Sequence, residues 1–93
     1  MSNQKFASVW DALEDTSAEA ESMKLRSKLM MALQEHLTRN GVSQAEAAKL
    51  LGVTQPRVSD LMRGKINLFG LDALVNMATA AGLQVEMRVR KAA

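Results

Sequence analysis

A run of polar side chains after Thr54 could contact the bases and phosphates of a nucleic acid. A glutamine amide can form two hydrogen bonds with adenine, and an arginine guanidinium can pair with guanine or with phosphate. The residues that we expect to face base edges are Gln55, Arg57, Ser59 and Asp60. The residues that we expect to contact the phosphate backbone are Gln44, Thr54, Arg63 and Lys65. The sequence therefore predicts a surface that combines base reading with phosphate contact.

Two short helices joined by a tight turn are needed to position these side chains. Ser43 and Glu46 have the S-x-x-E spacing of a capping box, which predicts the start of the first helix. Gly52 can adopt the left-handed conformation that ends this helix. The second helix is expected to begin after Thr54, a good N-cap residue, and it tolerates Pro56 in its first turn. The apolar residues whose spacing predicts a shared small core are Ala47, Leu51, Val53, Val58 and Leu61.

Three further helices are expected around this pair. Apolar residues at helical spacing predict a short amphipathic helix over residues 5–14. Thr16 and Glu19 have the spacing of a second capping box, so a separate long helix is expected from there to about residue 39. A last helix is expected over residues 71–81, ended by Gly82. The apolar stripe of the short first helix consists of Phe6, Val9, Trp10 and Leu13.

Residues 83–89 change period, because apolar and polar side chains alternate there as in a β-strand. A single strand cannot satisfy its own backbone groups, so it needs a partner. We expect two-fold pairing with the same strand of a second copy; the alternative is pairing with the acidic N-terminal arm of its own chain. The expected dimerisation residues are Leu83, Val85, Met87 and Val89.

The segment from Ser43 to Gly64 resembles the helix-turn-helix of the Cro and phage-repressor (XRE) family. The wider run over residues 23–89 resembles the HigA-like branch of type II antitoxins, on the strings A-E-A-A-K-L-L-G-V-T-Q-P-R-V-S-D-L-M-R-G-K and L-F-G-L-D-A-L. The resemblance implies a homodimer that binds a palindromic operator in double-stranded DNA and represses its own operon. It also implies a small basic toxin partner of the RelE/HigB kind, without indicating which surface holds the toxin.

Charge divides the chain into two unequal parts. Residues 1–22 carry one lysine and five acids, a net charge of −4, whereas residues 23–93 carry eleven bases and five acids, a net charge of +6. The basic part suits a polyanion. The acidic arm suits a basic protein, and its stripe Phe6, Val9, Trp10 and Leu13 could anchor the toxin. The alternative is that this stripe packs against its own domain.

The sequence contains no recognisable motif for catalysis or for metal binding. The chain has no cysteine, which excludes disulfides and thiolate metal sites, and we expect neither a metal nor a cofactor. His36 is the single histidine, and we expect it to stay solvated near the end of the long helix, where it favours the dipole. No nucleophile triad, HExxH motif or Gly-rich phosphate loop is present, so we do not expect an enzyme.

These observations predict an all-α, five-helix, lambda-repressor-like helix-turn-helix domain with a short amphipathic N-terminal helix and a C-terminal β-strand. The expected organisation is an acidic arm over residues 1–22, a DNA-binding domain over 23–82 and a dimerisation strand over 83–93. No long apolar run indicates a membrane span, so we expect a cytoplasmic protein. The predicted function is a DNA-binding repressor, most simply the antitoxin of a toxin pair. The alternatives are a free-standing regulator without a toxin and an adaptor that binds only proteins.

Overall fold

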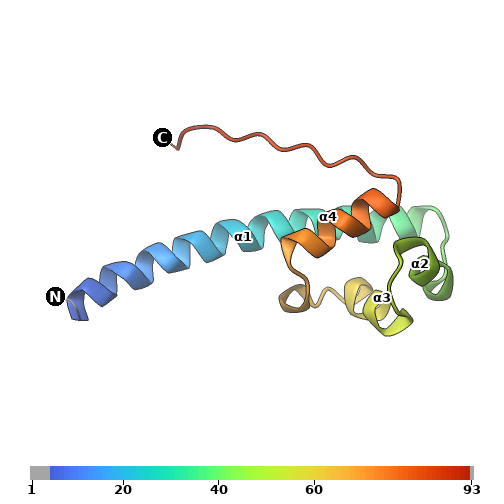
Figure 1. The fold of residues 1–93 in the computed structure, drawn as a ribbon, viewed down its shortest axis with the longest axis horizontal. Helices are drawn as coiled ribbons and strands as arrows, with labels where there is room; N and C mark the ends of the chain where they lie inside the picture. Colours follow the sequence, from blue (N-terminus) through green and yellow to red (C-terminus); the bar gives the residue numbers. More distant parts are fainter. Residues whose placement is uncertain (1–4, 93) are drawn as a thin grey trace.

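The computed structural model describes residues 5–92 of the chain, with side chains from residue 17 onward. A long helix, α1 (Lys5–Arg39), is followed by the short helices α2 (Gln44–Leu51) and α3 (Gln55–Met62). A single 3-10 turn, η1 (Ile66–Leu68), then leads into α4 (Leu71–Ala80). Helix α4 packs along the second half of α1, and α2 and α3 lie together below them (Figure 1).

The expected break between two N-terminal helices is wrong, because α1 runs without interruption through Thr16. The residues that follow Thr16 include Ala18, Glu19, Ala20 and Glu21, all good helix formers, and no glycine or proline precedes Gly41. A capping residue only starts a helix where the preceding chain leaves the helical conformation. The described part of the chain therefore has four α-helices in place of the five expected. Although α1 is long, no described helix is long and apolar enough to cross a membrane.

The expected C-terminal β-strand is also wrong for the single chain. After α4 the Leu83 N–H donates to the Ala78 carbonyl oxygen (2.9 Å), which completes the helix end. Residues 83–92 then run back along α1 without forming a strand (Figure 1). The described residues 5–82 contain no strand that could pair with this segment. The alternation of apolar and polar residues is therefore not sufficient to form a β-strand, because the backbone has no neighbouring strand among these residues to pair with.

The core lies where the second half of α1 meets the three shorter helices. Its largest fully buried side chains are Phe69, Leu33, Leu37, Leu61, Leu74 and Val58. The radius of gyration is 16.9 Å, compared with about 12 Å for a compact domain of this length. The difference arises because the first half of α1 projects beyond the other helices (Figure 1).

His36 ties α1 to the end of α4, which differs from the solvated position that we expected. Its side chain is half-buried, and Nε2 lies 3.1 Å from the carbonyl oxygen of Ala81. This contact helps to fix the angle between the two long elements of the core.

Candidate nucleic-acid interface

Local hydrogen bonds start and end α2 as the sequence predicts. The Ser43 hydroxyl accepts from the Glu46 N–H (3.1 Å), and the Ser43 N–H donates to Glu46 Oε1 (3.0 Å), which confirms the capping box. These bonds favour the ionised carboxylate and hold the pKa of Glu46 below its ordinary value. Gly52 has φ 71°, the left-handed conformation expected at the end of the helix. The turn into α3 is therefore built entirely from nearby residues.

The first turn of α3 is presented to solvent. The Thr54 hydroxyl accepts from the Arg57 N–H (3.3 Å), so this residue is the N-cap that the sequence predicts. Gln55 is exposed directly after the cap, while Val58 and Leu61, further along α3, are buried in the core. Gln44 is exposed at the first position of α2. The amide side chains of Gln44 and Gln55 are thus available to a ligand that approaches the starts of both helices.

Arg57, expected to face base edges, lies against the protein in this structure. Its Nη1 donates to the Leu68 carbonyl oxygen (2.6 Å), and its guanidinium carbon lies 3.9 Å from the centre of the Phe69 ring. The Phe69 side chain has no exposed surface. Arg57 therefore joins α3 to the segment that follows it.

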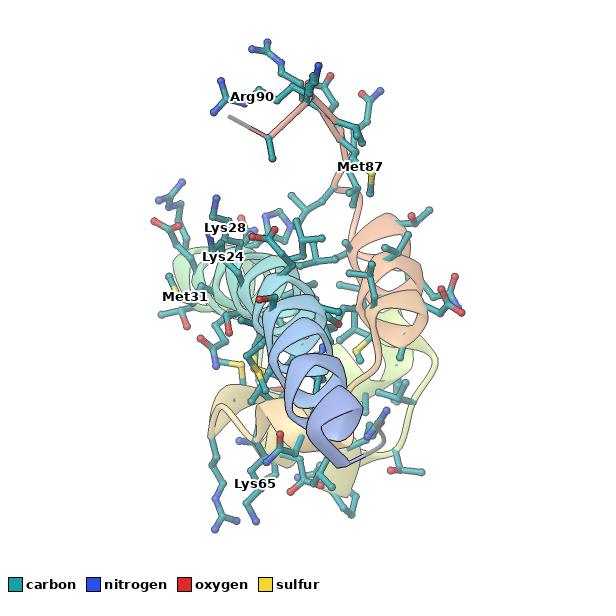
Figure 2. The ribbon with its side chains drawn as sticks, turned by 90° about the vertical axis from the view of Figure 1, so that its left-hand side faces the viewer. Lys24, Lys28, Met31, Lys65, Met87 and Arg90 are labelled. Carbon is teal, nitrogen blue, oxygen red and sulfur yellow. The ribbon has the colours of Figure 1, made fainter. Side chains whose placement is uncertain are left out.

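The remaining predicted contacts lie along α3 and just beyond it. Ser59 and Asp60 are half-buried, and Arg63 is exposed at the C-cap. Lys65 Nζ lies 3.8 Å from Asp60 Oδ1, and the lysine side chain is 45% exposed. Lys65 extends away from the helical body on the side opposite Lys24 and Lys28 (Figure 2). An exposed cation at this position can meet a phosphate that passes the end of α3.

Two side chains of α1 hold this region, and the sequence analysis missed both. Gln34 Nε2 donates to the Leu61 carbonyl oxygen (2.8 Å) at the end of α3. Arg26 Nη1 donates to the carbonyl oxygens of Ile66 (3.5 Å) and Phe69 (3.4 Å). These partners lie 27 to 43 residues away in the chain. Sequence spacing carries no signal for such long-range contacts, because a polar residue beside an apolar stripe is equally typical of a solvated helix face.

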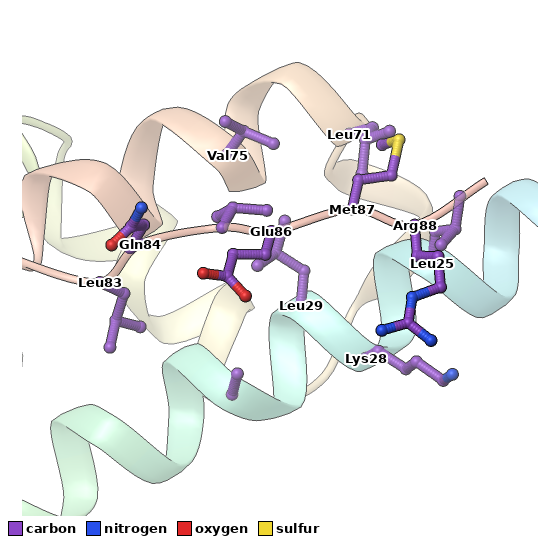
Figure 3. A pocket seen from close by; sticks show the side chains of 12 residues that line it. Leu25, Lys28, Leu29, Leu71, Val75, Leu83, Gln84, Glu86, Met87 and Arg88 are labelled. Carbon is purple, nitrogen blue, oxygen red and sulfur yellow. The ribbon is translucent and has the colours of Figure 1, made fainter.

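Three of the predicted dimerisation residues, Leu83, Val85 and Met87, line an open apolar groove, and Val89 lies just beyond it. The groove has a volume of about 480 Å³ and lies between α1, α4 and residues 83–88, with Leu25 and Leu29 on one wall and Leu71 and Val75 on another (Figure 3). Leu83 is half-buried and packs against the core. Val85, Met87 and Val89 are exposed by 40%, 67% and 84% of their surface. Apolar side chains with this exposure are available to a partner.

The predicted toxin anchors cannot be placed. The side chains of Phe6, Val9, Trp10 and Leu13 lie outside the described residues, although the backbone from Lys5 onward belongs to α1. The part of α1 that carries them extends beyond the core (Figure 1).

Comparison with known proteins agrees with this geometry. A family model described as a helix-turn-helix domain matches residues 12–90. A solved structure whose name assigns it to the XRE family of transcriptional regulators is similar to this chain, with a TM-score of 0.74 and 35% sequence identity. The match covers 80% of this chain and 83% of that chain. No curated protein matches the sequence.

Proposed function

Since the chain belongs to the helix-turn-helix family of XRE-type transcriptional regulators, we propose that it is a sequence-specific DNA-binding repressor. The single observation that carries this proposal is the exposed start of α3, where Gln55 follows the Thr54 cap. In the proposed complex this end of α3 enters the major groove and the Gln55 amide reads a base edge. Ser59 and Asp60 lie further along α3 and contribute to the same readout.

Phosphate contacts position α3 in the groove. Gln44 and Thr54 meet the DNA backbone near the starts of α2 and α3, and Arg63 and Lys65 meet it beyond the end of α3. Gel-shift titration against the promoter DNA of its own operon and against random duplex tests the proposal. A repressor binds its operator in strong preference to random DNA. Equal affinity for the two duplexes contradicts sequence-specific binding.

We further propose that the protein acts as a homodimer joined through Leu83, Val85, Met87 and Val89 and the apolar groove beside them. A dimer can place two α3 helices in successive major grooves about 34 Å apart on a palindromic operator. Three of these residues are exposed apolar side chains, and the groove leaves further apolar surface on α1 and α4 open to a second copy.

Sedimentation of the variant Met87→Asp tests the dimer. A carboxylate at the interface opposes burial, so this variant sediments as a monomer, with its helical circular dichroism unchanged. Met31→Asp is the matched control, because Met31 on α1 is also a methionine and is 62% exposed, compared with 67% for Met87. A dimer that persists in Met87→Asp places the interface elsewhere.

An antitoxin role is our proposal for the acidic N-terminal part of α1. Residues 1–22 carry a net charge of −4, and the first part of α1, from Lys5 onward, projects beyond the core (Figure 1). A small basic toxin of the RelE/HigB kind is the partner that this charge suits. Trp10 offers the largest apolar area to such a partner and is the expected anchor.

Co-expression with the neighbouring gene product tests the antitoxin role. Deletion of residues 1–14 releases the toxin and leaves operator binding measurable, because the deleted residues lie outside α2 and α3. A triple reversal of Asp11, Glu14 and Asp15 to lysine is the second variant, and it keeps the length of the chain. If both variants retain the partner as tightly as the unaltered chain, the toxin binds another surface. If no neighbouring gene encodes a small basic protein, the chain is a free-standing regulator, as the name of the similar structure also allows.

A further inference from the structure

We propose that Arg57 is a positioning residue, which fixes residues 64–70 against α3 so that Lys65 meets phosphate, and that base reading at the start of α3 falls to Gln55. This inference rests on the proposed DNA-binding function. It assigns different roles in DNA binding to two residues of α3, Arg57 and Gln55. It assigns to Arg57 a role different from the one that its residue type alone suggests.

The first observation is the way in which Arg57 is held. Its guanidinium stacks 3.9 Å from the centre of the Phe69 ring, and Nη1 donates to the Leu68 carbonyl oxygen at 2.6 Å. Phe69 is fully buried, with Arg57 above its ring. Movement of Arg57 toward a base edge therefore breaks a short hydrogen bond and exposes the face of an aromatic ring to water. Gln55 is already exposed, so it can approach a base edge without breaking a hydrogen bond or exposing an aromatic ring.

The second observation is that the segment after α3 is held from α1 as well. Arg26 donates to the carbonyl oxygens of Ile66 and Phe69, and Gln34 donates to that of Leu61. Arg57 supplies the bond to Leu68, the carbonyl between the two that Arg26 holds. The backbone on both sides of Lys65 is thereby fixed by side chains from two helices. A phosphate contact from a fixed backbone loses less entropy on binding than one from a mobile loop.

The third observation concerns the Lys65 side chain itself. Its Nζ lies 3.8 Å from Asp60 Oδ1 on α3, and the side chain is 45% exposed, so it remains accessible to a phosphate. Arg57 and Lys65 are joined through the same short segment, since Leu68 lies three residues after Lys65. Loss of the Arg57 contacts with Leu68 and Phe69 is therefore expected to weaken the contact between Lys65 and phosphate.

The substitution Arg57→Lys tests the assignment, because lysine keeps the charge but lacks the planar donor fork. We expect affinity for operator and for random duplex to fall by the same factor, about ten-fold, since the charged contact between Lys65 and phosphate is lost when residues 64–70 are no longer fixed. In a Lys65→Ala background, Arg57→Lys causes little further loss of affinity, because both substitutions remove the same contact between Lys65 and phosphate. Arg39→Lys is the matched control, since Arg39 is an exposed arginine at the end of α1 that lies outside the proposed DNA contacts, and we expect it to leave affinity nearly unchanged.

The alternative, direct base reading by Arg57, predicts different results. In that case Arg57→Lys lowers the preference for operator over random DNA and is additive with Lys65→Ala, and these outcomes overturn the proposal. A chain that binds operator and random duplex equally before any substitution contradicts the proposed function itself. The two failures are therefore distinguishable.

A measurement on the unaltered protein removes any dependence on the folding of variants. The Phe69 ring current shifts the side-chain resonances of Arg57 in the nuclear magnetic resonance spectrum of the free protein. A positioning residue keeps this shift when operator DNA is added, whereas a base-reading residue loses it as the guanidinium leaves the ring. Loss of the shift on operator binding overturns the proposal, and its persistence supports it.

Discussion

The two halves of α1 share one helical conformation and have different surroundings. In the second half, Met30, Leu33 and Leu37 are buried against α3 and α4, and Arg26 and Gln34 bind backbone carbonyls of other elements. In the first half, residues 17–22 are all exposed. Both halves are helical because their residues favour helix. Among the residues whose side chains the structure describes, those of the second half supply the contribution of α1 to the core, so the two halves are expected to differ in stability.

This comparison shows that helix formation and burial are separate properties of a sequence. An isolated helical segment in water is marginal, and tertiary packing supplies most of its stability. The second half of α1 is therefore the support on which α3 is held in place. Residues 17–22 of the first half are exposed and make no such contribution.

Removal of a core side chain from the second half is expected to have the largest effect. Leu33 has no exposed surface, so Leu33→Ala lowers the free energy of unfolding by about 2–5 kcal/mol. Met31→Ala, two residues away and 62% exposed, is the control and changes it by less than about 0.5 kcal/mol. Urea denaturation followed by circular dichroism measures both. Equal effects at the two positions contradict the burial that separates them.

Loss of the proposed base contact is expected to have the next largest effect. Gln55→Ala weakens operator binding by about 1–3 kcal/mol and changes binding to random duplex little, because a base contact is made only at the correct sequence. Gln44→Ala is the control, since a backbone contact contributes to both duplexes alike. The two affinities are measured by gel shift at one fixed salt concentration. An unchanged operator preference in Gln55→Ala removes this residue from the readout.

A matched pair of glycine substitutions compares the two halves of α1 directly. Ala20 and Ala32 are both exposed and lie in the first and second half. We expect Ala32→Gly to lower the free energy of unfolding by about 1 kcal/mol, the usual cost of glycine inside a helix. Ala20→Gly has a smaller effect on global unfolding, because the projecting half can open while the core stays folded. Amide hydrogen exchange, read residue by residue, detects that local opening. A larger global loss for Ala20→Gly indicates that the first half is packed in solution.

The capping box of α2 gives the smallest expected effect, which depends on pH. The pKa of Glu46 is lowered in the folded chain, mainly by the hydrogen bond from the Ser43 N–H. Its stabilising contribution is therefore complete above the ordinary value of 4.5 and is lost as the pH falls through the lowered folded value. Glu46→Gln has no carboxylate to protonate at this position. The difference in urea midpoint between the unaltered protein and Glu46→Gln therefore shrinks as the pH falls below 4.5 and Glu46 becomes protonated. A difference that stays constant with pH argues against the ionised capping bond.

The start of the DNA-binding region was the most predictable part of the fold. The caps at Ser43 and Thr54 and the end at Gly52 are formed by residues within four positions of one another, so their spacing is sufficient to predict them. The buried positions Ala47, Leu51, Val58 and Leu61 also follow from helical spacing.

Three features did not follow from capping motifs and periodicity. Thr16 could begin a helix or lie inside one, and the helical conformation of the residues before it decided the outcome. The alternating segment after Gly82 could not form a strand without a neighbouring strand, which a periodic pattern cannot supply. Arg57 could face DNA or its own chain, and its position depends on Phe69 and Leu68, which fold beside it only when α4 packs on α1.

The sequence by itself therefore determined the local elements, their caps and the polar side chains at the start of α3, because hydrogen bonds between near neighbours and helical periodicity control them. Tertiary structure decided which half of α1 is buried, where residues 83–92 run and which polar groups of α3 are free. Those outcomes depend on contacts between residues far apart in the chain, and the free energy of each contact exists only when both partners are in place.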